Sequence, residues 1–271
     1  GYFLYFLADE NVFFFRAKKK FKHIFSESEK YLGAGDEADS CAEVRNNCRY
    51  LYSAGGFRTY TGTDIKYFPS GSQLFDDIIS RLERAEKFVF IEFFIIADGV
   101  LFNRIFNVLA RKVKEGVDVR VIYDDMGSHK TLSAKCKKRL RDSGIKIQPF
   151  NRLIPRFSVA LNYRDHRKIV VVDGKTAYTG GCNLADEYIN EKRMHGYWKD
   201  VGLRIDGPAA DAFTVMFMRQ WEYVSGEAVD YSPFLNLAKR TESGSAVIPY
   251  ASGPELGGQS IAKNAYANII A

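Results

Sequence analysis

One stretch of the sequence holds residue types that can act together on a phosphate ester. His166 and Lys168 are two residues apart, and Asp173 follows five residues after Lys168. Residues 169–172 are β-branched throughout, which predicts a strand. Side chains two apart on a strand project to the same face. We therefore expect the imidazole and the ammonium to reach the same ligand.

A glycine-rich turn follows this strand and brings a carboxamide to the same region. Gly174 predicts a tight turn after Asp173, and residues 176–179 then return as the next strand. Gly181 and its glycine neighbour present Asn183 near the end of the sheet that holds the imidazole. The negative charge of a reacting phosphate spreads over its non-bridging oxygens, so an ammonium and an amide donor suit these oxygens. This set of groups suits phosphodiester chemistry without a metal ion.

The imidazole is the candidate nucleophile. A neutral imidazole can attack phosphorus and form a phosphohistidine, which divides one difficult displacement into two easier ones. The ring then needs an acceptor at its other nitrogen to hold the correct tautomer. Asp200, which precedes the strand-like residues 201–205, is the candidate acceptor. The alternative is a turn aspartate at the start of a strand, with no catalytic part.

Alternating helices and apolar strands must position these residues. Residues 75–82 have helical periodicity behind Ser72 as a candidate N-cap, and Gly116 and Gly144 stop two later helices. The pattern predicts an α/β fold, namely an α/β/α sandwich with a mixed, largely parallel sheet. No glycine-rich nucleotide loop is present. The expected helices are 75–82, 101–113 and 132–142, and the expected strands are 88–96, 117–123 and 145–150.

The spacing His166-x-Lys168-x-x-x-x-Asp173, followed by Gly181-x-Asn183, resembles the signature of the phospholipase D superfamily. The similarity to the first catalytic half of bacterial cardiolipin synthases extends over about residues 63–225. Residues 251–254 and the helix after them resemble the opening of the second half in that family. The segments that support this similarity are 67–71, 92–96, 124–128, 162–168 and 197–200.

This resemblance implies a phosphatidyltransferase that joins two phosphatidylglycerols, releases glycerol and uses no cofactor. His166 would be the nucleophile or its acid/base counterpart. Lys168 and Asn183 would hold the phosphate, and Gly181 stands where many members of the superfamily have serine. Asp173 and Asp200 would be supporting carboxylates.

Only one copy of the motif is present, whereas these enzymes place two face to face. His23, His129 and His195 lack the lysine and aspartate partners. The resemblance therefore implies a second half-domain of the same chain or a homodimer partner. Two alternatives remain open: a single-motif phosphodiesterase or nuclease that acts as a homodimer, and a catalytically silent membrane-associated module. Nucleic acid is the less favoured partner, because interleaved basic and aromatic residues are not evident in the periodic region.

The chain divides into three predicted parts. Residues 1–60 form a basic and aromatic membrane-proximal segment with a linker, residues 61–225 form the catalytic half-domain, and residues 226–271 form a linker and the start of a truncated second half-domain. The aromatic cluster of residues 1–7, followed by lysines, is typical of the cytoplasmic end of a membrane span, with an amphipathic helix of a soluble protein as the alternative. We therefore expect a cell-membrane protein that faces the cytoplasm, with its membrane-spanning segments upstream of this fragment.

Composition limits the remaining possibilities. The net charge of +6 in 271 residues favours an anionic partner such as a phospholipid membrane surface. Apolar runs are too short for a complete transmembrane helix. The four cysteines form no C-x-x-C pair, and no metal site is predicted. Glu92, an acid in an apolar strand, is a candidate for lining the substrate site, with a paired structural carboxylate as the alternative.

Overall fold

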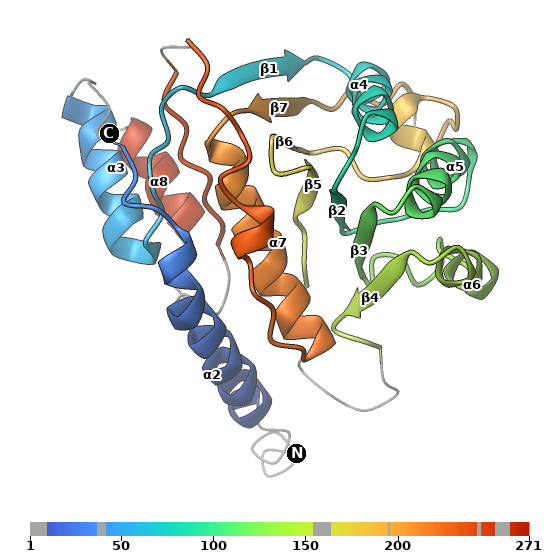
Figure 1. Ribbon diagram of the computed structural model, residues 1–271, viewed down its shortest axis with the longest axis horizontal. Coiled ribbons are helices and arrows are strands. Elements are labelled where there is room, and N and C mark those ends of the chain that lie inside the picture. Colours follow the sequence, from blue (N-terminus) through green and yellow to red (C-terminus); the bar gives the residue numbers. More distant parts are fainter. Residues whose placement is uncertain are drawn as a thin grey trace.

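A seven-stranded sheet forms the centre of the computed structural model, which describes residues 10–36, 42–153, 164–194, 196–242, 245–252 and 261–270. The strand order is β1-β7-β6-β5-β2-β3-β4, with helices on both faces (Figure 1). The strands are β1 (Asp64–Phe68), β2 (Phe88–Phe93), β3 (Asp118–Asp124), β4 (Lys146–Phe150), β5 (Lys168–Val172), β6 (Thr176–Gly180) and β7 (Gly202–Asp206).

The α/β/α architecture with a mixed sheet is confirmed, but the expected predominance of parallel pairs is wrong. Only β2 with β3 and β3 with β4 pair in parallel among the described strands. The other four pairs are antiparallel. The reason is connectivity: helices cross over between β2, β3 and β4, whereas β5 and β6 are joined by a tight turn, which requires an antiparallel hairpin.

Three helices cover one face of the sheet: α4 (Gly71–Glu83), α5 (Val100–Lys114) and α6 (Ala134–Asp142). Their apolar stripes pack on the inward side chains of β2, β3 and β5 in one core cluster. Helix α4 begins after Ser70, whose side chain accepts a hydrogen bond from the Gln73 amide. The predicted N-cap, Ser72, instead donates to the Ile189 carbonyl at 3.1 Å.

Helix α7 (Ala209–Ser225) covers the opposite face, and α2 (Glu10–Ser28) packs on α7 (Figure 1). The ring of Phe217 stacks on Phe90 of β2 at 4.6 Å between centroids. The ring of Phe21 stacks on Tyr223 at 3.8 Å. The described part of the N-terminal segment therefore belongs to this side of the core.

The remaining described α-helices bring an early and a late segment of the chain together. Helix α3 (Ala42–Gly55) packs against α8 (Ile261–Ile270), and Leu51 and Ile261 are buried in the same core cluster. The described residues also include the short 3-10 helices η1 (Glu29–Tyr31), η3 (Asp186–Ile189) and η4 (Ser232–Phe234). The expected aromatic segment 1–7 lies outside the described residues. Within the described part of the chain, no helix combines the length and apolarity needed to cross a bilayer.

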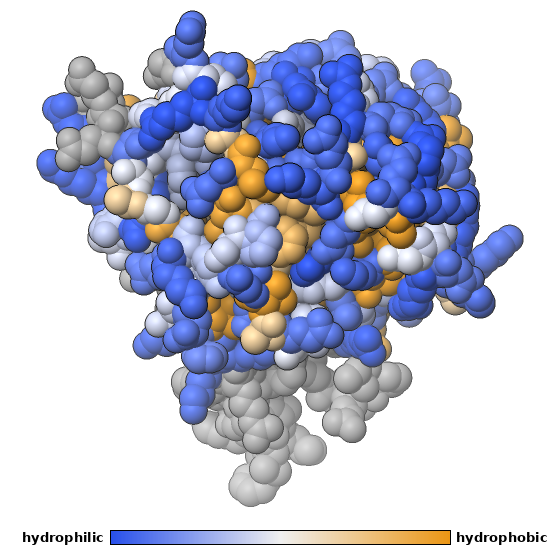
Figure 2. Space-filling model, in the orientation of Figure 1, coloured by the Kyte–Doolittle hydropathy of each residue, from blue (hydrophilic) through white to orange (hydrophobic). Residues whose placement is uncertain are grey.

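The surface seen in the direction of Figure 1 is mainly hydrophilic. Figure 2 shows apolar side chains gathered in the middle of this face, over α7 and the chain that crosses it. In the segment after α7, Phe234 packs edge-on against Phe88 and Phe90. The segment after α7 therefore closes the core on this side.

Candidate active site

The candidate site lies at one edge of the sheet, where β2, β3 and β6 end and where β5 begins. Lys168 is the first residue of β5 and pairs in register with Phe93, the last residue of β2. His166 is exposed just before this strand, whereas Lys168 is 6% exposed. The edge therefore presents the ring to solvent and holds the lysine beneath it.

The imidazole and the ammonium converge as expected. Nζ of Lys168 lies 3.1 Å from Nδ1 and 3.3 Å from Nε2 of His166. The same ammonium donates to the His166 carbonyl oxygen at 2.7 Å. The ring of Phe94 lies 4.8 Å from the imidazole and forms an apolar side of the site.

The surroundings lower the pKa of both His166 and Lys168, and the resulting protonation states suit nucleophilic attack. Partial burial of the ring and the adjacent Lys168 lower the pKa of His166, so the neutral ring predominates at pH 7. Burial lowers the pKa of Lys168 to about 8, while Asp165 and Asp200 act to raise it. At neutral pH the structure therefore combines a neutral imidazole with a protonated ammonium, which are the forms that attack and hold a phosphate.

Asn183 lies behind this edge and is 3% exposed. Its Oδ1 accepts a hydrogen bond from the Ile95 amide at 3.1 Å, and its Nδ2 donates to the Tyr188 hydroxyl at 2.7 Å. These contacts attach the chain after β6 to the chain after β2. The carboxamide is thus fixed in orientation, and one N–H of Nδ2 has no role in these two bonds.

Gly181 and Asp200 are in direct contact at the same edge. A Cβ atom on Gly181 would lie 2.1 Å from Oδ1 of Asp200, so a larger residue here would require the Asp200 side chain to move. Oδ1 of Asp200 accepts the Val201 amide at 2.7 Å. Among the residues that the structure describes, no hydrogen bond joins Asp200 to His166, so the predicted role of Asp200 as the acceptor for the ring stays a prediction.

Asp173 is at the opposite end of β5, which the structure does not bring to His166. Five residues of strand separate Asp173 from Lys168, a distance of about 16 Å. The carboxylate accepts backbone hydrogen bonds from Glu86, Lys87 and Phe88 at 2.7–3.0 Å. It therefore fixes the start of β2, and the structure places this motif residue in a supporting position remote from the reacting groups.

Replacing Asp173 by alanine should reduce the stability of the fold more than the catalytic rate. Three backbone donors would lose their acceptor, which we expect to lower the free energy of unfolding by about 2–4 kcal/mol. Urea denaturation followed by circular dichroism measures this change. Asp142→Ala, which removes a carboxylate from an exposed ion pair with Lys138, is the matched control and should change stability by less than about 1 kcal/mol. Full stability with lost activity would contradict the structural role.

Glu92 does not line the exposed edge. It is fully buried and projects from β2 to the face opposite Lys168, because it lies in register with Ile169 rather than with Lys168. Its Oε1 lies 2.9 Å from Nε of Arg167. This placement is at odds with the predicted substrate contact and fits the alternative of a paired structural carboxylate.

One carboxylate that the sequence did not mark as a site residue holds the His166 segment in place. Asp124, at the end of β3, accepts the Met126 and Gly127 amides through Oδ1 and the Asp165 amide through Oδ2, at 2.9–3.0 Å. It is a turn acid, as its position at a strand end indicates. The described residues contain no cluster of His, Cys, Asp or Glu side chains arranged to hold a metal ion.

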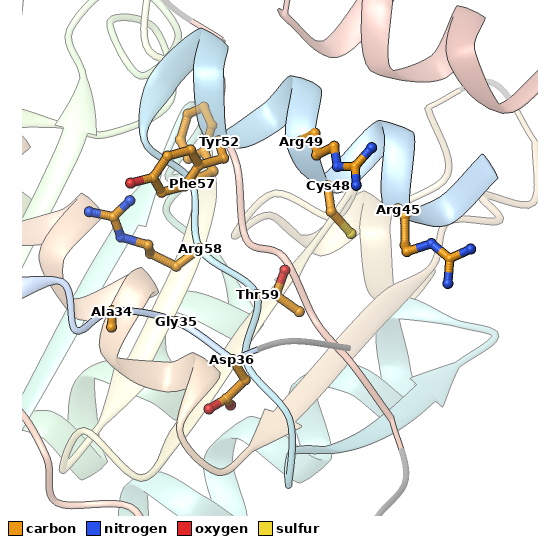
Figure 3. Close-up of a pocket in the computed structure, with 10 residues that line it drawn as sticks. All are labelled: Ala34, Gly35, Asp36, Arg45, Cys48, Arg49, Tyr52, Phe57, Arg58 and Thr59. Carbon is orange, nitrogen blue, oxygen red and sulfur yellow. The ribbon is translucent and has the colours of Figure 1, made fainter. Parts of the chain in front are cut away.

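A basic pocket of about 610 Å³ lies away from this edge, between α3 and the segment after η1. Figure 3 shows Arg45 and Arg49 projecting from α3 on one side, whereas the guanidinium of Arg58 points to the other side, toward Tyr52. The one acid of the lining, Asp36, is bonded to Thr61 and Arg240. Because the guanidiniums diverge, they form no phosphate cradle.

The fold and the histidine–lysine pair define the class of protein. A mixed sheet between two helical layers, with this pair at one open edge, is the arrangement of a phospholipase D-like domain. The family model described as "Cardiolipin synthase, PLD-like domain" matches residues 78–221. The chain therefore belongs to the cardiolipin synthase family of phospholipase D-like proteins.

One named relative agrees with this assignment, and one solved structure shares the fold. An uncharacterized protein of Streptococcus mutans is 42% identical over 86% of this chain and 50% of its own length. A probable cardiolipin synthase of Bacillus subtilis, YwiE, is 34% identical over 76% of this chain and 41% of its own length. The solved phosphatidylserine synthase of Haemophilus influenzae shares the fold with a TM-score of 0.50 and 15% identity, over 83% of this chain and 47% of that one. The chain thus spans about half the length of the curated relatives it matches.

Proposed function

We propose that the complete protein is a phosphatidyltransferase of the cardiolipin synthase type, which acts at the cytoplasmic face of the cell membrane on two molecules of phosphatidylglycerol. The observation behind the proposal is the convergence of His166 and Lys168 at an open sheet edge. The family of the chain and the names of its relatives support the lipid substrate.

In this mechanism His166 attacks the phosphorus of the first phosphatidylglycerol. The P–N bond forms while the P–O bond to the terminal glycerol breaks, and the glycerol takes a proton from an acid of a second motif. Lys168 and the remaining N–H of Asn183 hold the phosphate oxygens during the displacement. Asp200, whose charge acts on Lys168, accepts a hydrogen bond from the N–H of the imidazole when the ring turns toward the substrate.

A hydroxyl of the second phosphatidylglycerol completes the reaction. Its oxygen attacks the phosphohistidine, the P–N bond breaks, and the hydroxyl proton passes to the group that protonated the glycerol. This group would come from a second motif, either in the second half-domain of the same chain or in a homodimer partner. The roles of nucleophile and proton-transfer group are divided between His166 and the histidine of the second motif, and the reverse assignment of the two gives the same products.

The full-length protein in phosphatidylglycerol vesicles tests the proposal. We expect cardiolipin and free glycerol in equal amounts. Release of phosphatidic acid without cardiolipin would show a hydrolase instead of a transferase. Cleavage of DNA without any lipid product would contradict the proposal and support a phosphodiesterase. Vesicles of phosphatidylcholine, which lack the glycerol head group, are the matched control.

A further inference from the structure

The residues on either side of His166 are attached to a buried charged group beneath the sheet edge. Asp165 is 4% exposed and Glu92 is fully buried. Oδ1 of Asp165 accepts the Arg167 amide at 3.2 Å and Nε of Arg167 at 3.0 Å. The first of these bonds spans His166, so the side chain of Asp165 sets the backbone conformation of the candidate nucleophile.

Hydrogen bonding in this group is incomplete if both carboxyls are ionised. Oδ2 of Asp165 and both oxygens of Glu92 are buried without a hydrogen-bond partner. Arg167 lies 2.9 Å from Glu92, but this is a charge contact, because its Nε hydrogen bonds to Asp165. Unpartnered buried carboxylate oxygens are costly. One proton on Glu92 would supply a donor that Oδ2 of Asp165 can accept.

We propose that Glu92 is a protonated carboxylic acid that donates a hydrogen bond to Asp165 and thereby acts as a positioning residue for His166. The hydrogen bond orients Asp165, and Asp165 in turn fixes the backbone across His166. As a role in catalysis, the proposal rests on the proposed function. Glu92 itself contacts no substrate.

The surrounding charges favour this assignment of the proton. Burial raises the pKa of Glu92 well above its ordinary value, Arg167 opposes this change, and the adjoining Asp165 adds to it. On the same face of β3, Arg120 is bonded to Asp118 at 2.7 Å. On α7, Arg219 donates to Ser28 at 2.7 Å. Asp124 accepts the Asp165 amide and lies 3.5 Å from Arg164.

The same arrangement sets the electrostatic field at the reacting groups. Asp165 raises the pKa of both His166 and Lys168, in opposition to the effect of burial. A neutral Glu92 leaves the charge of Asp165 intact and in place. We therefore expect the loss of Asp165 to lower the pKa of Lys168, whereas the exchange of Glu92 for a neutral donor should leave it unchanged.

Three variants of the full-length protein separate positioning from bulk structure. Glu92→Gln keeps a donor for Asp165, so we expect cardiolipin formation within about threefold of the native rate and an unchanged pH profile. Glu92→Leu removes the donor and should lower kcat about 100-fold with little change in KM. Asp165→Asn should lower kcat and move the alkaline limb of the profile to lower pH. Glu83→Leu, at an exposed position on α4, is the control and should change neither kcat nor the pH profile.

Two spectroscopic measurements separate failure of this proposal from failure of the proposed function. The infrared band of a protonated carboxyl should be present in the native protein at pH 7 and absent in Glu92→Gln. The ring signal of His166 in NMR should shift in Glu92→Leu and stay in place in Glu92→Gln. These results would support the proposal even if no cardiolipin forms. Absence of the band, or equal damage by both Glu92 variants, would overturn it. If Glu92→Leu does not fold, the test compares the other two variants. Glu92→Gln should keep a rate and pH profile close to the native ones, whereas Asp165→Asn should lower kcat and move the alkaline limb to lower pH.

Discussion

His166→Gln in the full-length protein should abolish cardiolipin formation, with a rate at least about 10⁴-fold below the native one. Glutamine keeps much of the polarity of the ring but cannot form a phosphorus–nitrogen bond that a second alcohol breaks. The neutral ring at this exposed edge is the nucleophile or the proton-transfer group of the mechanism, and either role is lost. Thin-layer chromatography of labelled phosphatidylglycerol measures the product.

The control for this variant is a histidine without lysine and aspartate partners. His129 lies in the turn after β3, and His129→Gln should retain the native rate. Circular dichroism should show the same fold for both variants, because His166 is exposed at the sheet edge and does not belong to the core. An undiminished rate in His166→Gln would remove the basis of the proposed function.

Lys168→Met should lower kcat by about 10²–10³-fold, because the ammonium that holds the phosphate oxygens in the transition state is lost. The native enzyme should also lose activity above about pH 8, where Lys168 releases its proton. Below this pH the ammonium stays charged. At the acid end, activity should fall as His166 becomes protonated, at a pH below the ordinary pKa of histidine. A pH profile of kcat measures both limbs.

Lys168→Arg provides the matched comparison for this prediction. Arginine keeps its charge well above pH 8, so the alkaline limb should move upward even though its different shape lowers the maximum rate. Lys138→Met, on the exposed side of α6, should leave the profile unchanged. An alkaline limb that stays at the same pH in Lys168→Arg would assign it to another group.

The sequence was sufficient to predict most elements and the central pair of the site. A β-branched run fixes a strand with a period of two, so the convergence of His166 and Lys168 follows from local geometry alone. The expected helices and strands match α4 to α6 and β2 to β4 within a few residues. Ser70 rather than Ser72 caps α4, because cap choice depends on a backbone turn that periodicity does not report.

Local sequence patterns could not predict the features that depend on contacts between distant segments. Periodicity identifies strands but not their neighbours, so the antiparallel pairing of β5 with β2 was missed. The contacts of Arg167 with both Glu92 and Asp165 connect β2 to the segment before β5, and neither spacing nor residue type marks them in advance. The length of the predicted strand already places Asp173 at the end of β5 away from His166, although the motif groups the two residues together.

The packing of α3 against α8 has a consequence for synthesis of the protein. Leu51 emerges from the ribosome about two hundred residues before Ile261, its partner in the same core cluster. Until then the apolar side of α3 lacks its cover and stays available to chaperones or to neighbouring nascent chains. Completion of this corner is therefore a late event, and translation speed in the intervening region sets how long the exposed side must be protected.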